Sequence, residues 1–532
     1  MLLAPHAPDE EVFMAGMHCA GKVRALVGAI GRRQNAPETG EQLAASLNDI
    51  ARACKVRPVP DNISLSARIA RMQDPVWWAR NWRRELLREN ETIEHAQGHI
   101  RRQGDCYVSK HAMRRKKVRA KRNRLTLSRL EVVNEEGTFL NLLEASEKSL
   151  SNPKLRRAEL MVRMRGLEEV AAFMGHQGVF LTMTTPSRFH RFGADGQPNP
   201  KWQGATPKDA HEYLCEQWTR IRAAWHRQGI APYGFRVAEP HHDGCPHWHL
   251  LLFVPPEQVG WFTPRRYVAD RHATGRGMLG IAGAYAMEDS PGEAGAIRHR
   301  FTVKHIDPSK GSATGYIAKY ISKNIDGFTE AGDDIGLDFA SGKKASEAAK
   351  RVNTWASTWS IRQFQQIGGP AITPWRELRR LPSTGEEPVL GLDLFEGPRA
   401  AADRGMFALF WMLQGGPAVA RKDLTLKAMY QVMGVGKYGD EVTQVRGVIG
   451  RDPEHPDVEI PLTTRFHIWK TQPAGLGRID AEDAEFAHFM ELRDGPDGAF
   501  YRAYDAIEAA REFERSGEAA STWTSVNNCT ES

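Results

Sequence analysis

Two short segments of the chain hold residues whose types and spacing suit chemistry. The first contains His247-Trp248-His249. On a β-strand, alternate side chains project from one face, so both imidazoles would enter the same small volume. The second is Tyr316-Ile-Ala-Lys-Tyr320, and on a helix this i,i+4 spacing places both phenols on one face. The sequence therefore offers a pair of metal-binding groups and a pair of nucleophiles.

Glu239 lies shortly before the two histidines and is a possible third ligand. If residues 240–246 connect two strands of a hairpin, Glu239 ends one strand beside the start of the next. Two imidazoles and a carboxylate leave positions open for water and substrate. Such a set suits Mg²⁺ or Mn²⁺ at a phosphate and also Zn²⁺. A His-x-His pair also occurs by chance as buried or surface histidines, and ligand type alone does not select the metal.

His241, His242 and Cys245 could extend this site into a structural zinc cluster. A closed zinc site needs four ligands at defined spacing. These three residues crowd into one turn, where ligand geometry is poor. We therefore assign them to the loop, where His241 or His242 can still contact DNA.

The two tyrosines have a structural alternative, because aromatic residues at helical spacing commonly form part of a core. Lys319 and Lys323 give the same segment a cationic character that suits an anion better than a core. A free tyrosine has a pKa of about 10, so an attacking phenolate needs a neighbouring cation or metal. Lys319 is a candidate for this role.

The segments around these residues alternate between strand and helix patterns. The sequence predicts strands at 178–186, 233–239, 246–254 and 298–306, and helices from 208 to a stop at Gly229, from a cap at Ser312 to about 324, and at 343–355. Thr206-Pro207 resembles an N-cap followed by proline at the first helical position. This order predicts an α+β fold with a central antiparallel sheet flanked by helices.

Positive charge is concentrated in one segment, although the net charge of the chain is only +7. Residues 101–130 hold 12 Lys and Arg residues and a single acid, Asp105. Such a segment indicates contact with nucleic acid, where phosphate neutralisation supplies affinity, although an exposed basic surface would look similar. The candidate DNA-binding residues are Arg114, Arg115, Lys116, Lys117, Arg119, Lys121, Arg122 and Arg124, together with Lys323.

The remaining segments are mostly predicted to be helical. Residues 1–60 are interpreted as small helices broken by Gly and Pro, 125–167 as helices, and the region after Pro382 as short helices with a polar, disordered tail. Trp77, Trp78 and Trp82 lie on a helix whose aromatic face is either core or, alternatively, a DNA contact.

The length of 532 residues suggests about three units. We expect a helical, basic DNA-binding region at 1–170, a catalytic domain at 171–375 and an accessory region at 376–532. The six cysteines form no Cys-x-x-Cys pair, no signal peptide is evident, and the apolar run at 406–413 is too short to span a bilayer. These features predict a cytoplasmic protein.

Three motifs in a fixed order resemble those of the HUH endonucleases that initiate rolling-circle replication. They are Phe180-Leu-Thr-Met-Thr184, Glu239-x7-His247-Trp-His249 and the segment Tyr316–Tyr320. The paired tyrosines, the basic N-terminal extension and the segment 359–364 make the chain most similar to the replication gene A proteins of temperate tailed phages and their prophages. The resemblance covers residues 178–370.

This resemblance implies an HUH/Rep-type nuclease domain that nicks single-stranded or extruded origin DNA. It places the nucleophile at Tyr316 or Tyr320, and the ligands of a divalent metal at His247, His249 and Glu239. It also implies a 5′-phosphotyrosine intermediate, rejoining of the displaced strand, and a host helicase and DNA polymerase as partners in the bacterial cytoplasm. A relaxase or single-strand transposase would share this chemistry. A non-catalytic, zinc-stabilised DNA-binding protein is the alternative from another class.

Overall fold

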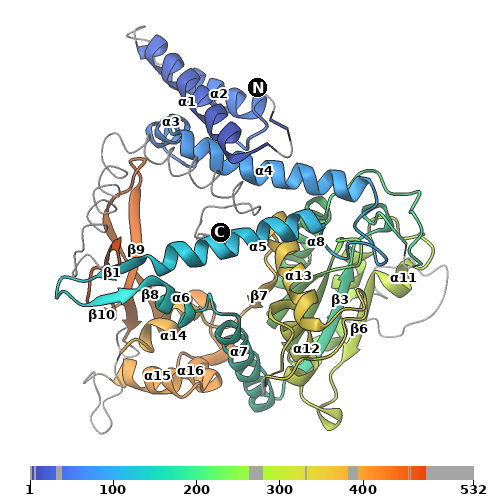
Figure 1. Cartoon of the computed structure of the whole chain (residues 1–532). Helices are drawn as coiled ribbons and strands as arrows, with labels where there is room; N and C mark the ends of the chain where they lie inside the picture. The colour runs from blue at the N-terminus through green and yellow to red at the C-terminus, as the bar shows by residue number, and fades with distance from the viewer. Residues whose placement is uncertain are drawn as a thin grey trace.

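A five-stranded antiparallel sheet lies at the centre of the part of the protein that carries the motifs (Figure 1). The computed structural model describes residues 3–4, 7–31, 39–193, 195–262, 280–329, 332–381, 393–452, 455 and 457–474. The strand order is β6-β3-β5-β4-β7, with bounds β3 Gln177–Thr184, β4 Tyr233–Pro240, β5 Pro246–Val254, β6 Phe301–His305 and β7 Phe364–Ile367. The predicted α+β class with an antiparallel sheet is confirmed.

Successive side chains along each strand point to opposite faces of the sheet, and different helices cover the two faces. One face places Leu181 and Trp248 in a core with α8 (Pro207–Arg227) and α13 (Ala345–Trp359). The other places Phe180 and Leu251 in a second core with α7 (Pro153–Met174) and α12 (Ala313–Ile325). His247, His249 and Glu239 share this second face, since they alternate with the residues of the first.

Helix boundaries around the sheet agree with several sequence signals. Thr206 and Asp209 form a capping box at the start of α8, and the Ser312 hydroxyl accepts a hydrogen bond from Gly315 N at 2.9 Å at the start of α12. The predicted strand at 298–306 is shorter, because Arg298 belongs to the helix α11 (Ala296–His299). The edge strand β7 was not predicted, since its four residues are too few for a clear alternation.

The N-terminal helices form a separate core at the top of Figure 1. They are α1 (Asp9–Gly31), α2 (Thr39–Ala53), α3 (Leu65–Met72) and α4 (Pro75–Ala96). The expectation of small helices broken by glycine was wrong for α1, which continues through its glycines. Gly16 permits close packing, because a Cβ there would lie 2.7 Å from the Pro75 carbonyl oxygen of α4. Trp78 and Trp82 are buried, which confirms their interpretation as core.

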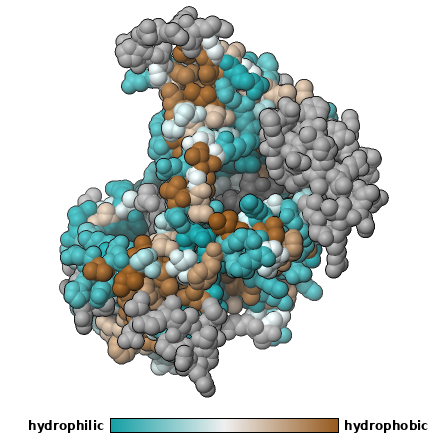
Figure 2. All heavy atoms as spheres, turned by 90° about the vertical axis from the view of Figure 1, so that its left-hand side faces the viewer, coloured by the Kyte–Doolittle hydropathy of each residue, from teal (hydrophilic) through white to brown (hydrophobic). Residues whose placement is uncertain are grey.

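The flanking regions, which we expected to be helical, also contain two smaller sheets. One has the order β11-β1-β2, with β1 Leu130–Val133, β2 Phe139–Asn141 and β11 Lys470–Pro473, and the other has the order β10-β9-β8, with β8 Leu426–Val435, β9 Glu441–Arg451 and β10 Glu459–Thr463. Long-range partners stabilise these strands, and helical periodicity in the sequence does not reveal them. In Figure 2, which views this side of the molecule, apolar and polar surface are interspersed.

The other helices are α5 (Lys110–Ser128), α6 (Leu142–Glu147), α9 (Val259–Phe262), α10 (Gly280–Ala286), α14 (Ile372–Leu378), α15 (Asp393–Asp403) and α16 (Phe407–Met412). Helix α7 continues through residue 171 and helix α14 continues through residue 375, so each of the two expected domain boundaries falls within a helix. The three-part division stays a prediction. Within the described residues, no helix has both the length and the apolarity needed to cross a membrane. The expected disordered tail lies outside the described residues.

Candidate active site

Glu239, His247 and His249 form one cluster on the α12 side of the sheet. Strands β4 and β5 pair so that Glu239 lies directly opposite His247. The Nε2 atoms of His247 and His249 are 2.9 Å apart, and Glu239 Oε2 lies 3.8 Å from the first and 3.6 Å from the second. Among the described residues, these three form the one group of side chains with metal-ligating atoms gathered this closely. The three predicted ligands are therefore brought together.

The spacing of the three ligand atoms suits a single small cation. Ligand atoms about 2.1 Å from a metal are separated by about 3.0 Å in an octahedral site and about 3.4 Å in a tetrahedral one. The observed separations of 2.9 to 3.8 Å lie near these values. Two nitrogens and one carboxylate oxygen fit Mg²⁺, Mn²⁺ or Zn²⁺ without selecting among them. The residues present thus fit a divalent ion.

Two neighbouring side chains orient the ligands. Thr182 Oγ1 lies 3.1 Å from His249 Nδ1, so the hydroxyl fixes the ring with Nε2 facing the cluster. Asn324 Nδ2 donates hydrogen bonds to Glu239 Oε1 and, at 2.6 Å, to the Tyr320 carbonyl oxygen. Asn324 is fully buried and was not predicted as a site residue. Its position one helical turn after Tyr320 was the available signal.

The electrostatics of the cluster favour the ligand forms of its side chains. Burial alone would raise the pKa of Glu239, but hydrogen bonding with His249 and the Lys323 ammonium hold that pKa below its usual value. Burial lowers the pKa of His247 well below its usual value, and nearby imidazoles and Lys323 add to this effect. The carboxylate is therefore ionised and His247 neutral at neutral pH, as metal binding requires.

Both predicted tyrosines lie on α12, on the face of the sheet that carries the metal cluster. The ring centroid of Tyr320 lies 4.2 Å from that of His249, and the centroid of Tyr316 lies 6.3 Å from that of Tyr320. Both rings also contact Phe180 of β3. Burial is the main cause that raises the pKa of Tyr320, so this phenol needs a nearby cation or metal before it can ionise. The two tyrosines are thus partly core residues and partly site residues.

Cationic side chains lie beside the two phenols. The ammonium of Lys319 is exposed and lies 4.9 Å from the ring centroid of Tyr316 and 4.8 Å from that of Tyr320. Lys304 of β6, which was not predicted, lies 4.3 Å from the Tyr316 ring centroid. Lys319 therefore lies within reach of both rings, as its candidate role requires.

Contacts from α7 fix the position of the tyrosine helix. The Glu168 carboxylate accepts hydrogen bonds from Ala313 N at 2.6 Å and Thr314 N at 2.9 Å, at the first turn of α12. A carboxylate at a helix N-terminus is also favoured by the helix dipole. At the other end, Asp326 forms an ion pair with Arg157 of α7. Helix α12 is therefore held at both ends, which fixes the phenols relative to the sheet.

The turn between β4 and β5 carries the histidines and the cysteine that we assigned to the loop. His241, His242 and Cys245 lie in this turn, and none of them belongs to the three-residue metal cluster. The His241 ring nevertheless lies 4.1 Å from the His247 ring, and burial lowers the pKa of His241 to about 3. The buried Asp243 organises the turn by accepting a hydrogen bond from Cys245 N at 3.1 Å.

Lys323, a candidate DNA-binding residue, lies on α12 beside the metal cluster. Its Nζ atom is 3.0 Å from Asp338 Oδ1 and 4.0 Å from Glu239 Oε2. Asp338 also accepts a hydrogen bond from the Tyr107 hydroxyl at 2.6 Å. Tyr107 N in turn donates to the His242 carbonyl oxygen at 3.2 Å. A segment far upstream in the sequence thus contributes to this edge of the site, which the sequence did not indicate.

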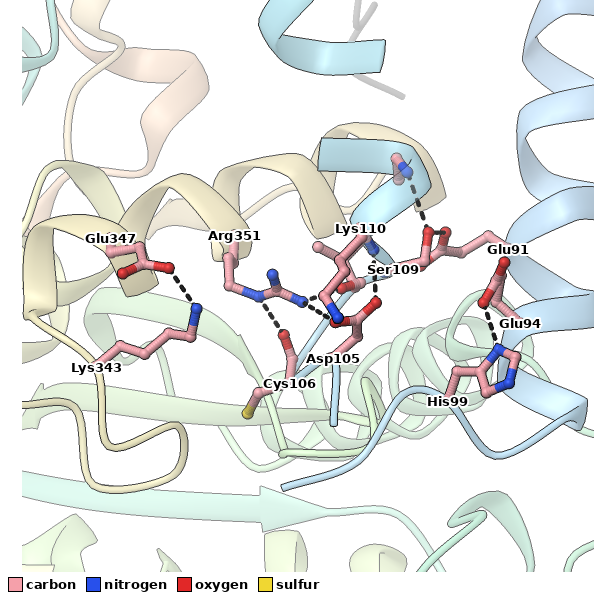
Figure 3. Close-up of polar contacts among 12 residues, drawn as sticks. Glu91, Glu94, His99, Asp105, Cys106, Ser109, Lys110, Lys343, Glu347 and Arg351 are labelled. Atoms are coloured by element: carbon pink, nitrogen blue, oxygen red, sulfur yellow. Dashed lines mark hydrogen bonds and ion pairs between the residues drawn. The ribbon is translucent and has the colours of Figure 1, made fainter. Parts of the chain in front are cut away.

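The start of the basic helix α5 is fastened to α4 and α13 (Figure 3). Glu91 of α4 accepts hydrogen bonds from Ser109 N at 2.8 Å and Ser109 Oγ at 2.6 Å. Arg351 of α13 donates to the Cys106 carbonyl oxygen at 2.7 Å. Asp105, the single acid of this segment, accepts from Lys110 N at 2.7 Å. These contacts place α5 beside the domain that carries the candidate active site.

The cations of α5 are distributed around a helix with few buried positions. Among the described residues of this helix, Ala112 and Val118 are the buried ones. Arg114, Lys116, Lys117, Lys121 and Arg124 are exposed, and Arg115, Arg119 and Arg122 are partly buried. Lys116 donates to Ser357 Oγ of α13 at 3.0 Å, and Arg124 pairs with Glu147 at 2.7 Å. Their role in DNA binding stays a prediction.

The fold and the site together define an α+β protein with a two-histidine, one-carboxylate cluster facing a helix with two tyrosines. Residues 33–328 match the Bacteriophage replication gene A protein (GPA) family. The chain belongs to this family, which confirms the resemblance to the replication gene A proteins.

Individual relatives are similar to this chain over about three quarters of its length. The Replication gene A protein of Escherichia phage 186 is 39% identical over 413 residues, which cover 76% of this chain and 56% of that protein. The Replication gene A protein of Escherichia phage P2 is 37% identical over 411 residues, covering 75% and 51%. A probable replication endonuclease from a prophage-like region of Salmonella paratyphi A is 35% identical over 432 residues, covering 78% and 50%.

The chain spans about half the length of the curated relatives it matches. No solved structure matches the chain.

Proposed function

We propose that this protein is a metal-dependent nicking and closing endonuclease that initiates rolling-circle DNA replication. The observation that carries the proposal is the placement of Tyr316 and Tyr320 opposite the cluster of Glu239, His247 and His249. The proposed fold is that of an HUH nuclease, with both histidines on a central strand. Family membership and relatives named as replication endonucleases support a role in replication over conjugation or transposition.

In the proposed mechanism, Glu239, His247 and His249 would hold a divalent ion, and Asn324 and Thr182 orient two of these ligands. When bound, such an ion would supply positive charge that stabilises the negative charge developing on the scissile phosphate. One tyrosine oxygen forms a bond to phosphorus while the bond from phosphorus to the 3′ oxygen breaks. The phenol loses a proton and the leaving oxygen gains one. The products are a 5′-phosphotyrosine ester and a free 3′-hydroxyl.

The second tyrosine allows a second cleavage without release of the first DNA end. Because the ester retains the free energy of the phosphodiester bond, rejoining needs no ATP. Lys319 lies near both rings and would stabilise whichever phenolate forms. Alternation of the two tyrosines would therefore cut the regenerated origin and close the displaced strand.

The substrate in this proposal is single-stranded or extruded origin DNA. The cations of α5 would bind its phosphates beside the site, since Arg351 of the same domain holds the start of α5 through the Cys106 carbonyl oxygen and through an ion pair with Asp105. The free 3′-hydroxyl would serve a host polymerase, with a host helicase separating the strands. The reaction would take place in the cytoplasm of the bacterial host.

The decisive experiment is detection of a covalent protein–DNA adduct. A pool of 3′-end-labelled single-stranded oligonucleotides that tile the replicon carrying this gene is incubated with the protein and Mg²⁺ or Mn²⁺. We expect a labelled band that survives denaturation and maps by mass spectrometry to Tyr316 or Tyr320. Removal of the metal with EDTA, or the change His247→Ala with His249→Ala, should abolish the band.

Matched variants separate the site tyrosines from other tyrosines. The double variant Tyr316→Phe with Tyr320→Phe should form no adduct, whereas Tyr430→Phe should form it normally, because Tyr430 is exposed on β8 and distant in sequence from the site. An adduct that persists in the double variant would refute the nucleophile assignment. Stoichiometric zinc without any cleavage would favour the non-catalytic alternative.

A further inference from the structure

A short turn between α12 and α13 carries prominent apolar side chains next to the candidate active site. Phe339 is 91% exposed, more than any other large apolar residue of the described chain, and Leu337 is 74% exposed. Isolated exposed apolar residues usually need no explanation. These two, however, flank Asp338, whose buried carboxylate faces inward and binds Lys323 of the site.

The turn is held firmly in place despite its exposed tip. The Asp338 carboxylate accepts hydrogen bonds from the Tyr107 hydroxyl at 2.6 Å and from Ser341 N at 2.8 Å, and pairs with Lys323 at 3.0 Å. In the main chain, Asp338 N donates to the Lys343 carbonyl oxygen at 2.7 Å and Gly342 N donates to the Asp338 carbonyl oxygen at 2.8 Å. A ligand that binds Phe339 would therefore order little additional structure, which favours affinity.

The surroundings of Phe339 are cationic. The Arg102 guanidinium lies 5.6 Å from the Phe339 ring centroid. The same guanidinium adds to burial in lowering the pKa of His242, which places Arg102 beside the turn between β4 and β5. Lys344 is also exposed at the base of the Phe339 turn. An aromatic face bordered by cations matches a nucleotide, with its flat base and charged phosphate.

We propose that Phe339, with Arg102 beside it, stacks on an unpaired base of the DNA strand that enters the active site. The inference rests on the proposed function and adds a contact for the substrate. Asp338 connects this aromatic platform to the site, because Lys323 contacts both Asp338 and Glu239. Stacking on an aromatic ring tolerates any base sequence, so the platform would hold single-stranded DNA without selecting the origin.

The test is equilibrium binding of fluorescein-labelled oligodeoxythymidine, measured by anisotropy in EDTA so that no cleavage occurs. Phe339→Ala should weaken binding about tenfold, as expected for the loss of one base stack. Phe339→Trp should bind at least as tightly as the unchanged protein. The matched control is Phe173→Ala, which removes a phenylalanine that is 77% exposed at the end of α7, and binding should not change.

Two further measurements distinguish stacking from a phosphate contact. Phe339→Ala should leave the salt dependence of binding unchanged, whereas Arg102→Gln should reduce the slope of log K against log salt by about 0.7 if it contacts one phosphate. An abasic oligonucleotide of the same length should bind the unchanged protein and Phe339→Ala equally. The inference would be overturned if both proteins bound oligodeoxythymidine with the same affinity. It would also be overturned if Phe339→Ala weakened binding of the abasic strand as much as binding of oligodeoxythymidine.

These outcomes are independent of the endonuclease assignment. If the adduct forms and Phe339→Ala binds oligodeoxythymidine like the unchanged protein, the platform is refuted and the proposed function remains. If Phe339→Ala weakens binding selectively but no adduct forms with any oligonucleotide, the platform is supported and the nicking reaction is refuted.

Discussion

The ring of Tyr320 lies against the imidazole of His249, with 4.2 Å between their centroids, whereas Tyr316 lies one helical turn farther toward the start of α12. The two tyrosines therefore differ in their surroundings, although the sequence presents them as an equivalent pair. Tyr320 is the closer to the candidate metal ligands. Tyr316 packs edge-on against Phe180 and lies near the ammonium groups of Lys304 and Lys319.

This difference predicts unequal effects of the two single substitutions. Tyr320→Phe should reduce adduct formation with a single-stranded oligonucleotide by a factor on the order of 1,000, as expected when a nucleophile is removed. Tyr316→Phe should retain most of the first cleavage and lose the transfer of the DNA end to a second tyrosine. Peptide mapping of a single-turnover adduct measures both. An adduct on Tyr316 alone in the unchanged protein would contradict this assignment.

Asn324 should act as a positioning residue for the metal site. Asn324→Ala removes the donor to Glu239 and should raise the Mn²⁺ concentration needed for half-maximal cleavage about 10- to 100-fold, as for other partners of metal ligands. Asn353→Ala is a matched control, because the Asn353 amide donates two hydrogen bonds, both to main-chain carbonyl oxygens, and lies outside the cluster. Melting temperatures of both variants, measured without metal, separate a loss of fold stability from a loss of metal affinity. Equal Mn²⁺ requirements in both variants would remove this role.

The basic helix α5 should contribute affinity for DNA through phosphate contacts. Replacing Arg114, Lys117 and Lys121 with glutamine should weaken DNA binding and make its salt dependence shallower by about 0.7 to 0.9 per lost contact. The control is the replacement of three exposed lysines elsewhere, Lys22, Lys154 and Lys422, with the same change in net charge. If both triple variants show the same salt slope, α5 has no special role.

Glu91 should make the attachment of α5 depend on pH. Burial raises the pKa of Glu91 from its usual 4.5 to about 7. Between these values the folded protein retains a proton that the unfolded chain has lost, so the free energy of unfolding falls as the pH rises through this window. The loss amounts to about 3 kcal/mol above pH 7. Below pH 4.5, the carboxyl is protonated in both states and contributes no loss.

Glu91→Gln should remove this dependence while preserving an acceptor for Ser109 N. Its urea unfolding midpoint should therefore exceed that of the unchanged protein at pH 8 and approach it at pH 4.5. Glu89→Gln on the same helix changes an exposed carboxylate that pairs with Lys55. Its unfolding midpoint should show no such gain between pH 4.5 and pH 8. Equal pH profiles for Glu91→Gln and the unchanged protein would contradict the raised pKa.

Local signals in the sequence sufficed for the elements around the site. Residue types typical of strands, bounded by turn residues, predict three strands at 178–186, 233–239 and 246–254, and the hairpin between the last two places Glu239 opposite His247 in the observed register. Ser312 predicts the start of α12, and the i,i+4 spacing places both tyrosines on one face. These features depend on backbone periodicity and capping, which involve residues close together in the chain.

The regions outside that domain were predicted less well. Strands β8 and β9 form an antiparallel pair joined by a turn that begins at Gly436, whereas we expected helices there. Strand pairing depends on partners that the periodicity of a single sequence does not reveal. Strand β1 is flanked by β2 and by the distant β11. Helix α1 continues through Gly16 because that glycine lies against Pro75 of α4. In each case, packing between distant segments overrode local preference.

The sequence by itself determined which side chains could bind a metal or attack a phosphate, and on which faces of a strand and a helix they lie. Only the tertiary structure decided that Asn324 binds Glu239, that Tyr107 and Asp338 hold Lys323 beside the cluster, and that Tyr320 lies closer to His249 than Tyr316 does. The physical reason is range. Periodicity and capping act over a few residues, whereas these contacts join segments separated by as many as 231 positions.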